Sequence, residues 1–271
     1  MEGQEYRIGD VADLVGLSRD ALRFYEKKGV LVARKKENGY RYYSENDIYK
    51  LMYVLYQRKM NTSLEEIEGL VWEGTSKSNL KVRTRQRIAE ERAKMWSHQQ
   101  AVTRLKLVER DLESAENCLN VCQVKRFPSA YIMGWCQSLQ EGLKEWFRLS
   151  SSAAGLDMTY FYNILTYEPE KGLIQEGTNL LLYRGIEPYL DAGIDLSAKQ
   201  TTQEVDCIYS VVESAQALPD PSVYQWMAEW GRRLGMKPGR RIYSNNMISF
   251  FKKDTTTYCL ELYLPLETKE G

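Results

Sequence analysis

The spacing of apolar residues near the N-terminus predicts a helix-turn-helix. Apolar residues recur at helical spacing from Ile8 to Val15, and Gly16 then interrupts the pattern. Ser18 is a favourable N-cap residue for a second helix, which is expected to end at Gly29. Two short helices joined by a tight turn that contains glycine are typical of a helix-turn-helix.

A β-hairpin is predicted directly after these helices. The segment VLVARKKENGYRYY has two β-prone pieces around Glu37-Asn38-Gly39. Asn-Gly between such pieces is a strong hairpin signal, because both residues tolerate a positive φ. A hairpin in this place is the wing of a winged helix-turn-helix.

Two further helices are predicted after the hairpin. Ser44 can cap a helix that runs to about Lys59. Ser63 and Glu66 have the spacing of a capping box, so another helix is expected from Ser63 to Trp72.

One long helix is predicted over residues 80–124, where the sequence has no proline or glycine. Apolar residues repeat every seven positions along it, at Ile88, Met95 and Val102 and then at Leu105, Leu112 and Leu119. A stripe sustained over this length, with charges elsewhere, predicts a coiled coil with a second copy of the chain and therefore a homodimer. The alternative is a long helix that packs on its own domain.

After Phe127-Pro128 the pattern changes to short strands, and the order strand, helix, strand, strand is predicted twice. The first set comprises SAYIMGWCQ, LQEGLKEWFRLS, TYFYNILTYEP and TNLLLYRGIE, and the second VDCIYSVVES, SVYQWMAEWGRRLG, RRIYSNNMISFF and TYCLELYLPL. We interpret the repeat as an internal duplication. It predicts a compact α+β domain with a cleft between two related halves.

Composition and charge narrow the class of protein. The chain is 43% hydrophobic and 27% charged, which is ordinary for a globular protein. It has no long apolar run and no apolar signal core, and its five cysteines have no framework spacing, so we expect a cytoplasmic protein with reduced thiols. The net charge is zero, but residues 19–59 hold 11 Lys and Arg against five Asp and Glu, whereas residues 127–271 are net acidic. This asymmetry indicates different partners for the two ends.

Three segments resemble the MerR family of transcription regulators. They are YRIGDVADLVGLSRDALRFYEKKGVL, NGYRYYSENDI and the capping box SLEEI, which follow one another in the family's order and spacing. Where family members often have Gly-Phe before the capping serine, this chain has Asn61-Thr62.

The resemblance implies an α+β protein in three parts. Residues 1–76 would be a winged helix-turn-helix DNA-binding domain and residues 77–125 a coiled-coil dimerisation helix. Residues 126–271 are similar to the GyrI-like effector-binding domain of the multidrug-sensing branch, on the repeated strand order and the closing strand LELYLPL. Family members bind a pseudo-palindromic promoter site as homodimers and distort it so that RNA polymerase holoenzyme can engage. Activation of transcription by a small-molecule effector is therefore expected.

The residues expected to contact DNA follow from the resemblance and from the chemistry of their side chains. A recognition helix in the major groove needs donors for base edges and phosphates, and amphipathic rings and guanidinium groups suit contacts to phosphate and sugar. The candidates are Ser18, Arg19, Arg23, Tyr25 and Lys27 on the second helix, Tyr40, Arg41 and Tyr42 on the wing, and Lys59. Phe24 is expected in the core. The alternatives are solvated surface charges and, for the wing tyrosines, packing within the wing.

The C-terminal domain is expected to bind a hydrophobic, cationic small molecule. Aromatic faces attract cations, and a carboxylate among them supplies the counter-charge. Alternation in TYCLELYLPL places Glu261 on one face with Tyr263, and Glu261 matches an acidic position of the related drug-sensing domains. The candidate ligand-binding residues are Glu261, Tyr263, Tyr160, Tyr162, Trp135 and Trp226. The alternative for Glu261 is a solvent-exposed strand face.

Two other functions remain as alternatives. Cys118 and Cys122, four residues apart, could share a metal or an oxidant in a thiol-responsive regulator, although burial as small apolar residues is favoured. A thiol sensor would also have no use for the long C-terminal region. Catalytic motifs are lacking, and the single His98 lies in the predicted coiled coil, so no enzyme and no cofactor or metal are expected. A small-molecule hydrolase is the remaining alternative.

Overall fold

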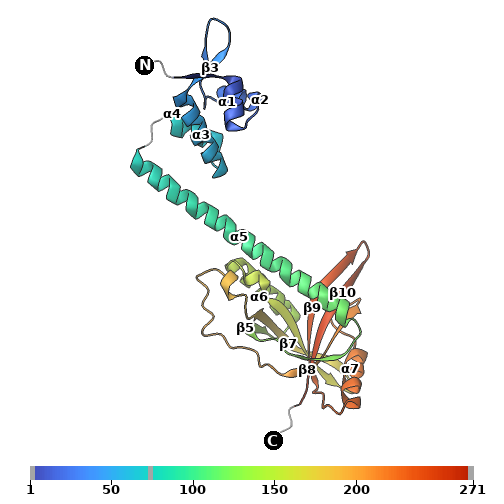
Figure 1. The fold of residues 1–271 in the computed structure, drawn as a ribbon. Coiled ribbons are helices and arrows are strands. Elements are labelled where there is room, and N and C mark those ends of the chain that lie inside the picture. Colours follow the sequence, from blue (N-terminus) through green and yellow to red (C-terminus); the bar gives the residue numbers. More distant parts are fainter. Residues whose placement is uncertain (1–3, 73–75, 268–271) are drawn as a thin grey trace. The chain divides into compact units, whose positions relative to one another are not determined.

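The computed structural model describes residues 4–72 and 76–267 and divides into two compact units, one up to Glu91 and one from Arg92 on (Figure 1). Helix α5 (Lys77–Cys118) contributes its first turns to one unit and the rest to the other. Each unit has hydrophobic clusters of its own.

The first unit contains the predicted helix-turn-helix and wing. Its elements are β1 (Glu5–Arg7), α1 (Ile8–Val15), α2 (Arg19–Lys27), β2 (Arg34–Lys35), β3 (Arg41–Ser44), α3 (Glu45–Lys59) and α4 (Leu64–Trp72). Gly16 ends α1 with a left-handed φ of 69°, and the Ser18 side chain accepts the Ala21 N–H to cap α2. The three strands form an antiparallel sheet in the order β1-β3-β2.

The hairpin of the wing is confirmed, but only one of the two residues that tolerate a positive φ adopts it. Gly39 has a φ of 78°, but Asn38 is not among the described residues with positive φ. The Gly39 N–H donates to the Lys36 carbonyl (2.8 Å), and the Tyr40 N–H donates to Asn38 Oδ1 (3.1 Å). The connection is longer than two residues, so one left-handed residue is sufficient to reverse the chain.

The predicted helix starts after the wing are confirmed. Ser44 and Asp47 form a reciprocal capping box at the start of α3. Ser63 and Glu66 do the same before α4, with distances of 2.8 and 3.2 Å. Asn61 adopts a left-handed φ of 59°, which explains how an asparagine can stand where family members often have glycine.

Helix α5 ends earlier than predicted. It stops at Cys118, because Asn120 takes a left-handed φ of 55° and its N–H donates to the Val211 carbonyl (2.8 Å). The chain then enters β4 (Gln123–Arg126), which pairs with β8 (Asp206–Ser214). The helix end is therefore set by a contact with a strand far along the sequence.

The predicted apolar stripe of α5 is exposed, and another face of the helix packs on the second unit. The exposed large apolar side chains include five stripe residues of α5 and Leu119, which directly follows the helix. The five are Ile88, Met95, Val102, Leu105 and Leu112. Thr103 and Asp111 are buried, and Leu107 and Ala115 pack partly against the core of the second unit. The two predicted roles of this helix thus fall on different faces of it.

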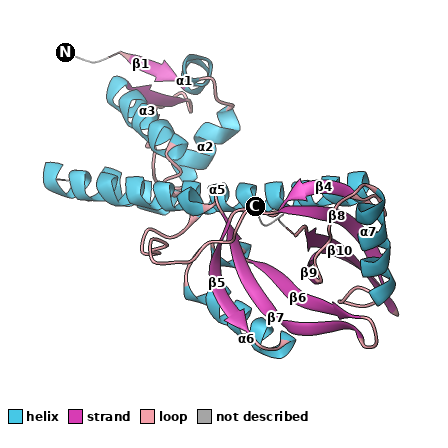
Figure 2. Cartoon of the chain, turned by 90° about the horizontal axis from the view of Figure 1, so that it is seen from below, coloured by secondary structure: helices cyan, strands magenta, loops and turns pink. Residues whose placement is uncertain are grey.

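The second unit is built on a seven-stranded antiparallel sheet with the order β4-β8-β10-β9-β6-β7-β5 (Figure 2). The first half comprises β5 (Ala130–Cys136), α6 (Leu139–Ser152), β6 (Tyr160–Glu168) and β7 (Gly172–Tyr183). The second comprises β8, α7 (Pro221–Arg233), β9 (Arg241–Lys252) and β10 (Thr255–Pro265). The predicted duplication is confirmed, since both halves have the same order of elements and meet where β6 pairs with β9.

Both long helices of the repeat cover one face of this sheet. The backbone of α6 at Gly142 contacts Phe161, and α7 at Gly231 contacts Ile208. These two residues alternate with Tyr162 and Tyr209 along their strands, so the tyrosines point to the opposite face. That opposite face is the one against which α5 packs.

Candidate functional site

One face of α2 is basic and exposed. Arg19, Arg23 and Lys27 follow one another at intervals of four residues, and all three are exposed, whereas Leu22 on the inner side is completely buried. Arg23 forms an ion pair with Asp20 (3.1 Å) in which both side chains remain more than half exposed. Such an exposed pair contributes little to stability, so the arginine can exchange its partner.

Phe24 and Tyr25 on α2 have the opposite burial to the one expected from the sequence. Phe24 is 47% exposed, so the expectation that it is a core residue was wrong. Tyr25 is half-buried and packs against both hydrophobic clusters of the first unit. Helical geometry explains the difference, because Tyr25 lies on the same side as buried Leu22, three residues earlier. Ser18 caps the helix with its side chain.

The wing carries exposed basic and aromatic side chains. Tyr40 is 58% exposed, and the Arg7 guanidinium lies 5.3 Å from the centre of its ring. Arg41 is held by Glu26 of α2 at 3.0 Å. The ring of Tyr42 lies under the Lys36 ammonium group at 4.7 Å. The wing is therefore fixed to the recognition helix through Glu26 while its outer side stays accessible.

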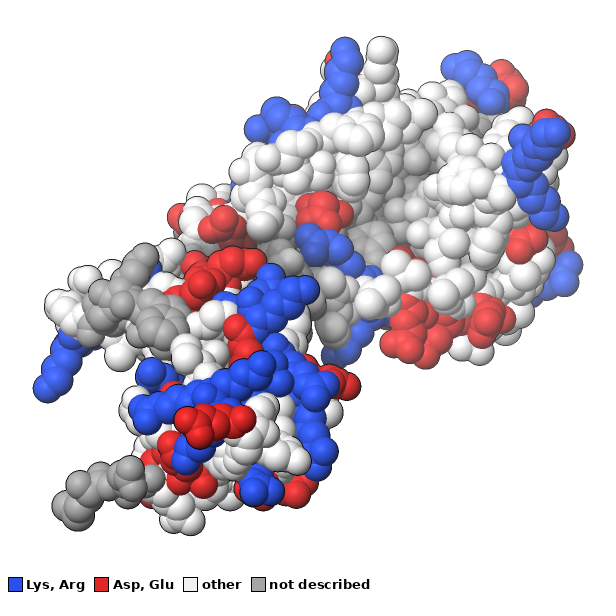
Figure 3. Space-filling model, turned by 90° about the horizontal axis from the view of Figure 1, so that it is seen from above, with Lys and Arg blue, Asp and Glu red and all other residues white. Residues whose placement is uncertain are grey.

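Further basic side chains adjoin the predicted ones. Arg7, Arg34 and Lys35 are exposed on the same small sheet, and Lys59 is exposed in the last turn of α3. Lys and Arg side chains gather on this unit in the space-filling view (Figure 3). The excess of basic residues between positions 19 and 59 is the sequence signal that could have identified Arg34 and Lys35.

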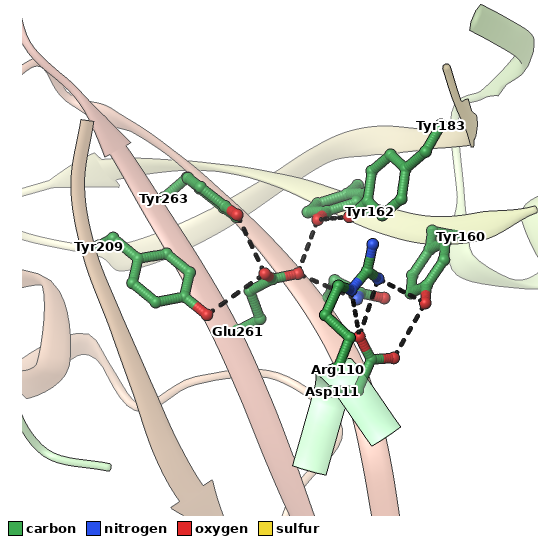
Figure 4. Close-up of polar contacts among 9 residues, drawn as sticks. Arg110, Asp111, Tyr160, Tyr162, Tyr183, Tyr209, Glu261 and Tyr263 are labelled. Atoms are coloured by element: carbon green, nitrogen blue, oxygen red, sulfur yellow. Dashed lines mark hydrogen bonds and ion pairs between the residues drawn. The ribbon is translucent and has the colours of Figure 1, made fainter. Parts of the chain in front are cut away.

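In the second unit, a buried carboxylate is surrounded by hydroxyl groups. Glu261 on β10 is 6% exposed (Figure 4). It accepts hydrogen bonds from the hydroxyls of Tyr162 (2.7 Å), Tyr263 (3.0 Å) and Tyr209 (3.4 Å), and from the Asn245 amide (3.3 Å). Strand register explains the meeting, because Asn245 on β9 is directly opposite Glu261 on one side and Tyr162 on the other.

The hydroxyls extend the network away from Glu261. Tyr162 and Tyr183 share a hydrogen bond of 2.5 Å, and the ring of Tyr183 stacks on that of Tyr160 with centroids 4.5 Å apart. Burial, followed by the negative charge of Glu261, raises the pKa of Tyr162 and Tyr183 well above the ordinary value. These hydroxyls therefore stay protonated and act as donors. We call the five tyrosines around Glu261 the tyrosine cluster; they are Tyr160, Tyr162, Tyr183, Tyr209 and Tyr263.

Helix α5 adds a charged pair at one border of the tyrosine cluster. Asp111 is 6% exposed, and its carboxylate accepts from Arg110 Nη2 (2.8 Å) and from the Tyr160 hydroxyl (3.0 Å). The Arg110 guanidinium also donates to the Tyr160 hydroxyl (2.6 Å) and lies 4.8 Å from the centre of the Tyr183 ring. Burial raises the pKa of Asp111, and the bond from Arg110 opposes that rise.

A lysine adjoins another part of the tyrosine cluster. Lys125 on β4 places its ammonium group 3.9 Å from the centre of the Tyr209 ring and 5.6 Å from that of Tyr263. Both geometries are within the range of cation–π contacts. Aromatic faces of the cluster thus already meet cations of the chain itself.

Of the six residues predicted to bind ligand, the structure brings four together. Glu261, Tyr263, Tyr160 and Tyr162 belong to the cluster. Trp226 does not, because it lies on α7, which covers the other face of the sheet. Trp135 is also outside it: it is exposed on β5, four strands away from β10.

Sequence reasoning missed several members of the site. They are Tyr183, Tyr209, Asn245, Arg110 and Asp111. The duplication contained a signal for Tyr183, because LLLY at the end of β7 corresponds to LELY in β10 and aligns Tyr183 with Tyr263. Nothing local in the sequence marks Arg110 and Asp111, which reach the site only because α5 packs on the sheet.

The two cysteines proposed as an alternative sensor are not on one helix. Cys118 is the last residue of α5, and Cys122 lies beyond the left-handed turn. Burial raises the pKa of Cys122 to about 11, which disfavours the reactive thiolate. Within residues 4–72 and 76–267, no group of three or more His, Cys, Asp or Glu side chains could hold a metal ion.

Among the helices that the structure describes, none combines the length and apolar character needed to cross a membrane.

Comparisons with known proteins concern mainly the first unit. Residues 6–72 match the model of the MerR HTH family regulatory proteins. The HTH-type transcriptional regulator ZntR of Escherichia coli (strain K12) is 34% identical over 67 residues, which are 24% of this chain and 48% of ZntR. The chain thus spans about half the length of that relative. A cryo-EM structure of the EcmrR–DNA complex in EcmrR-RPo matches 97% of this chain and 100% of that chain, but the identity of 14% and the TM-score of 0.36 are too low to add to the assignment.

A longer match decides the family. Heavy metal-dependent transcription regulator 2 of Rhizobium meliloti (strain 1021) is 32% identical over 104 residues, which are 36% of this chain and 71% of the relative. This match extends beyond the helix-turn-helix and covers most of the relative. The chain belongs to the MerR family of helix-turn-helix regulatory proteins.

Proposed function

We propose that this protein is a ligand-responsive transcription regulator. It would bind a pseudo-palindromic promoter site as a homodimer and distort the DNA so that its partner, RNA polymerase holoenzyme, can engage. It would activate transcription on binding a hydrophobic organic cation. In this proposal residues 1–76 bind DNA, residues 77–125 form the dimer, and residues 126–271 are a GyrI-like effector-binding domain of the multidrug-sensing type. The single observation that carries the proposed sensing function is the buried Glu261 inside the tyrosine cluster.

Family membership and the basic face of α2 support the proposed DNA binding. Arg19, Arg23 and Lys27 project from one side of a helix that an N-cap and a buried leucine fix in place. An exposed helix face of this kind fits the major groove, and the exposed wing fits the neighbouring backbone. The proposed contacts are Ser18, Arg19, Arg23, Lys27, Tyr40, Arg41, Tyr42 and Lys59. Tyr25 would instead support α2 from inside, because its ring packs against the clusters.

The exposed stripe of α5 supports the proposed homodimer. Five large apolar side chains at heptad spacing are exposed along α5, and Leu119 continues the stripe directly after the helix. A single monomer rarely exposes a contiguous apolar surface of this length, and a second copy of the same helix would cover it. A dimer would also give the protein the two-fold symmetry that a pseudo-palindromic site requires.

The energetics of Glu261 support the proposed cationic effector. A buried carboxylate costs several kcal/mol unless it is paired and hydrogen-bonded. Glu261 has four donors within 3.4 Å, all of them neutral, so its hydrogen bonds are satisfied while its charge is not neutralised by any of them. An organic cation between the aromatic rings would supply both the counter-charge and apolar contact. Neutral ligands would gain only the contact.

The substitution Glu261→Gln tests this function. We expect N-methylquinolinium, a flat aromatic cation, to bind the variant at least about tenfold more weakly than the wild type, because a buried charge pair is lost. Neutral quinoline should be affected far less. Glu213→Gln, which removes an exposed acid on the neighbouring strand β8, is the matched control and should bind both compounds like the wild type.

Calorimetry on the full chain, with promoter activation measured in parallel, provides the readout. Equal affinity of the wild type and the Glu261→Gln variant for N-methylquinolinium would contradict the proposed sensing function. It would leave the DNA-binding function standing, because that function rests on the other unit.

A further inference from the structure

The Arg110 guanidinium lies where a ligand cation would be expected to lie. It is within 4.8 Å of the Tyr183 ring centre and 5.2 Å of the Tyr160 ring centre. Its Nη2 donates both to the Asp111 carboxylate and to the Tyr160 hydroxyl. Aromatic faces, a carboxylate and a hydroxyl are the groups that recognise a planar, hydrogen-bonding cation.

The acceptors are buried, whereas the side chain of Arg110 that reaches them is partly exposed. Asp111 is 6% exposed and Tyr183 is 7% exposed. The Arg110 side chain is 44% exposed, so it reaches this place from the surface of α5. A side chain that lies half in water can leave without opening the core, and the buried acceptors would remain in position.

This place is connected directly to Glu261. Tyr183 shares a hydrogen bond with Tyr162, which in turn donates to Glu261 (Figure 4). The tyrosine cluster and its border therefore contain two buried carboxylates, Glu261 and Asp111, with Arg110 and Lys125 as the cations beside the rings. These four formal charges cancel. A ligand cation that meets Glu261, whose hydrogen-bond donors are all neutral, would add a positive charge to the cluster as a whole. The balance of charge would be restored if one of the chain's own cations moved away.

We propose that Asp111, Tyr160 and Tyr183 form a subsite for the guanidinium or amidinium group of a ligand, and that Arg110 fills this subsite until such a ligand displaces it. The inference rests on the proposed sensing function and deepens it, since it names a ligand class. Quaternary cations would reach Glu261 but could not satisfy Asp111, because they have no N–H donors. Aryl amidines and aryl guanidines would pack against the tyrosine rings and donate hydrogen bonds to Asp111.

Displacement of Arg110 would also remove one contact that holds α5 on the second unit. This helix is fixed to the second unit at other points, where Arg104 pairs with Asp157 and the Gln100 amide donates to the Tyr189 carbonyl (2.9 Å). Arg110 thus makes one of several contacts between α5 and the second unit. Its displacement would loosen one turn of the helix, while the contacts of Arg104 and Gln100 would remain. Binding at the subsite would therefore change the packing of the helix that carries the exposed apolar stripe.

The test compares two arginines of the same helix. Arg110→Ala empties the subsite, whereas Arg104→Ala removes a neighbouring ion pair to the same domain without touching the tyrosine cluster. The probes are benzamidine, which carries the cationic group, and benzamide, its neutral isostere. Calorimetry on the full-length protein should show that Arg110→Ala binds benzamidine at least about tenfold more tightly than the wild type and Arg104→Ala do. Benzamide should bind all three proteins alike.

A second pair of variants covers the case in which Arg110→Ala does not fold because Asp111 loses its partner. Arg110→Gln retains a donor for Asp111 and should show a smaller gain of the same sign. Adding Asp111→Asn to Arg110→Gln should abolish that gain. Unchanged benzamidine affinity in both Arg110 variants would overturn the subsite, and so would an equal gain for benzamide.

The two proposals can fail separately. Weaker binding of N-methylquinolinium by Glu261→Gln, with no gain of benzamidine binding by Arg110→Ala, would leave the sensing function supported and overturn the subsite. The reverse pair of results would support the subsite and overturn the role of Glu261.

Discussion

The exposed surfaces of this protein and its buried tyrosine cluster use charged and aromatic side chains in opposite ways. On α2, Arg23 is in water, and its partner Asp20 is exposed as well. In the tyrosine cluster, Glu261 and Asp111 are almost completely buried, and hydrogen bonds from the chain itself surround them. A surface for a macromolecule can exchange partners at little cost, whereas a site for a small molecule has to be preorganised.

The largest effect is expected at the exposed stripe of α5. Leu112→Lys would put like charges into the proposed seam of the dimer, so we expect monomers at concentrations at which the wild type is dimeric. Light scattering measures the mass. Glu113→Lys, at the next exposed position of the same helix, is the control and should remain dimeric. A dimeric Leu112→Lys protein would place the seam elsewhere.

The next effect separates affinity from stability in the first unit. Arg23→Ala should weaken binding to the protein's own promoter by about 1–3 kcal/mol if the side chain contacts a base. Its free energy of unfolding should change by less than about 0.5 kcal/mol, because the pair with Asp20 is exposed. Gel-shift titration and denaturant unfolding give the two quantities. A large loss of stability with unchanged DNA affinity would show that Arg23 supports the fold and does not contact DNA.

The buried site should behave in the opposite way. Tyr162→Phe removes a hydroxyl that bonds both Glu261 and Tyr183. The unsatisfied groups should lower the free energy of unfolding by about 1–3 kcal/mol, without an effect on DNA affinity. Tyr258→Phe, on the same strand as Glu261 but outside the tyrosine cluster, should cost less. Similar losses for the two variants would show that the hydroxyl network contributes no special stability.

The smallest effect concerns pH. Burial raises the pKa of Asp111 in the folded protein above its ordinary value of 3.8, so folding favours the protonated form. The contribution of this group to stability is therefore greatest below pH 3.8 and decreases as the pH rises through the raised pKa. Relative to Asp111→Asn, the wild type should lose stability over that interval. Unfolding by denaturant at several pH values measures the difference, and a difference that does not vary with pH would contradict the prediction.

Elements whose signals are local could be predicted from the sequence, and arrangements that depend on distant contacts could not. The capping residues Ser18, Ser44 and Ser63 fix helix starts within a few positions, and the structure has helices there. The end of α5 depends on a bond from Asn120 to Val211, a partner on a different strand. A heptad pattern alone therefore extended that helix too far.

The candidate site shows the same division. Alternation along β10 predicts that Glu261 and Tyr263 share a face, and they do. The position of Asn245 between Glu261 and Tyr162 depends on the register of three strands, which no short segment encodes. The contribution of Arg110 depends on how a helix packs across the sheet, which lies still further from any local pattern.

The duplicated domain also breaks its own symmetry. The two halves repeat LLLY and LELY at matching places, so the position of Glu261 in one half is taken by buried Leu181 in the other. A repeat with an acid in both halves would present two equivalent anionic centres and could bind two cations. This chain has such an acid on the repeated strand of one half only, so the two halves of the domain present different groups to a bound molecule. A ligand with two identical cationic ends would therefore meet Glu261 at one end only.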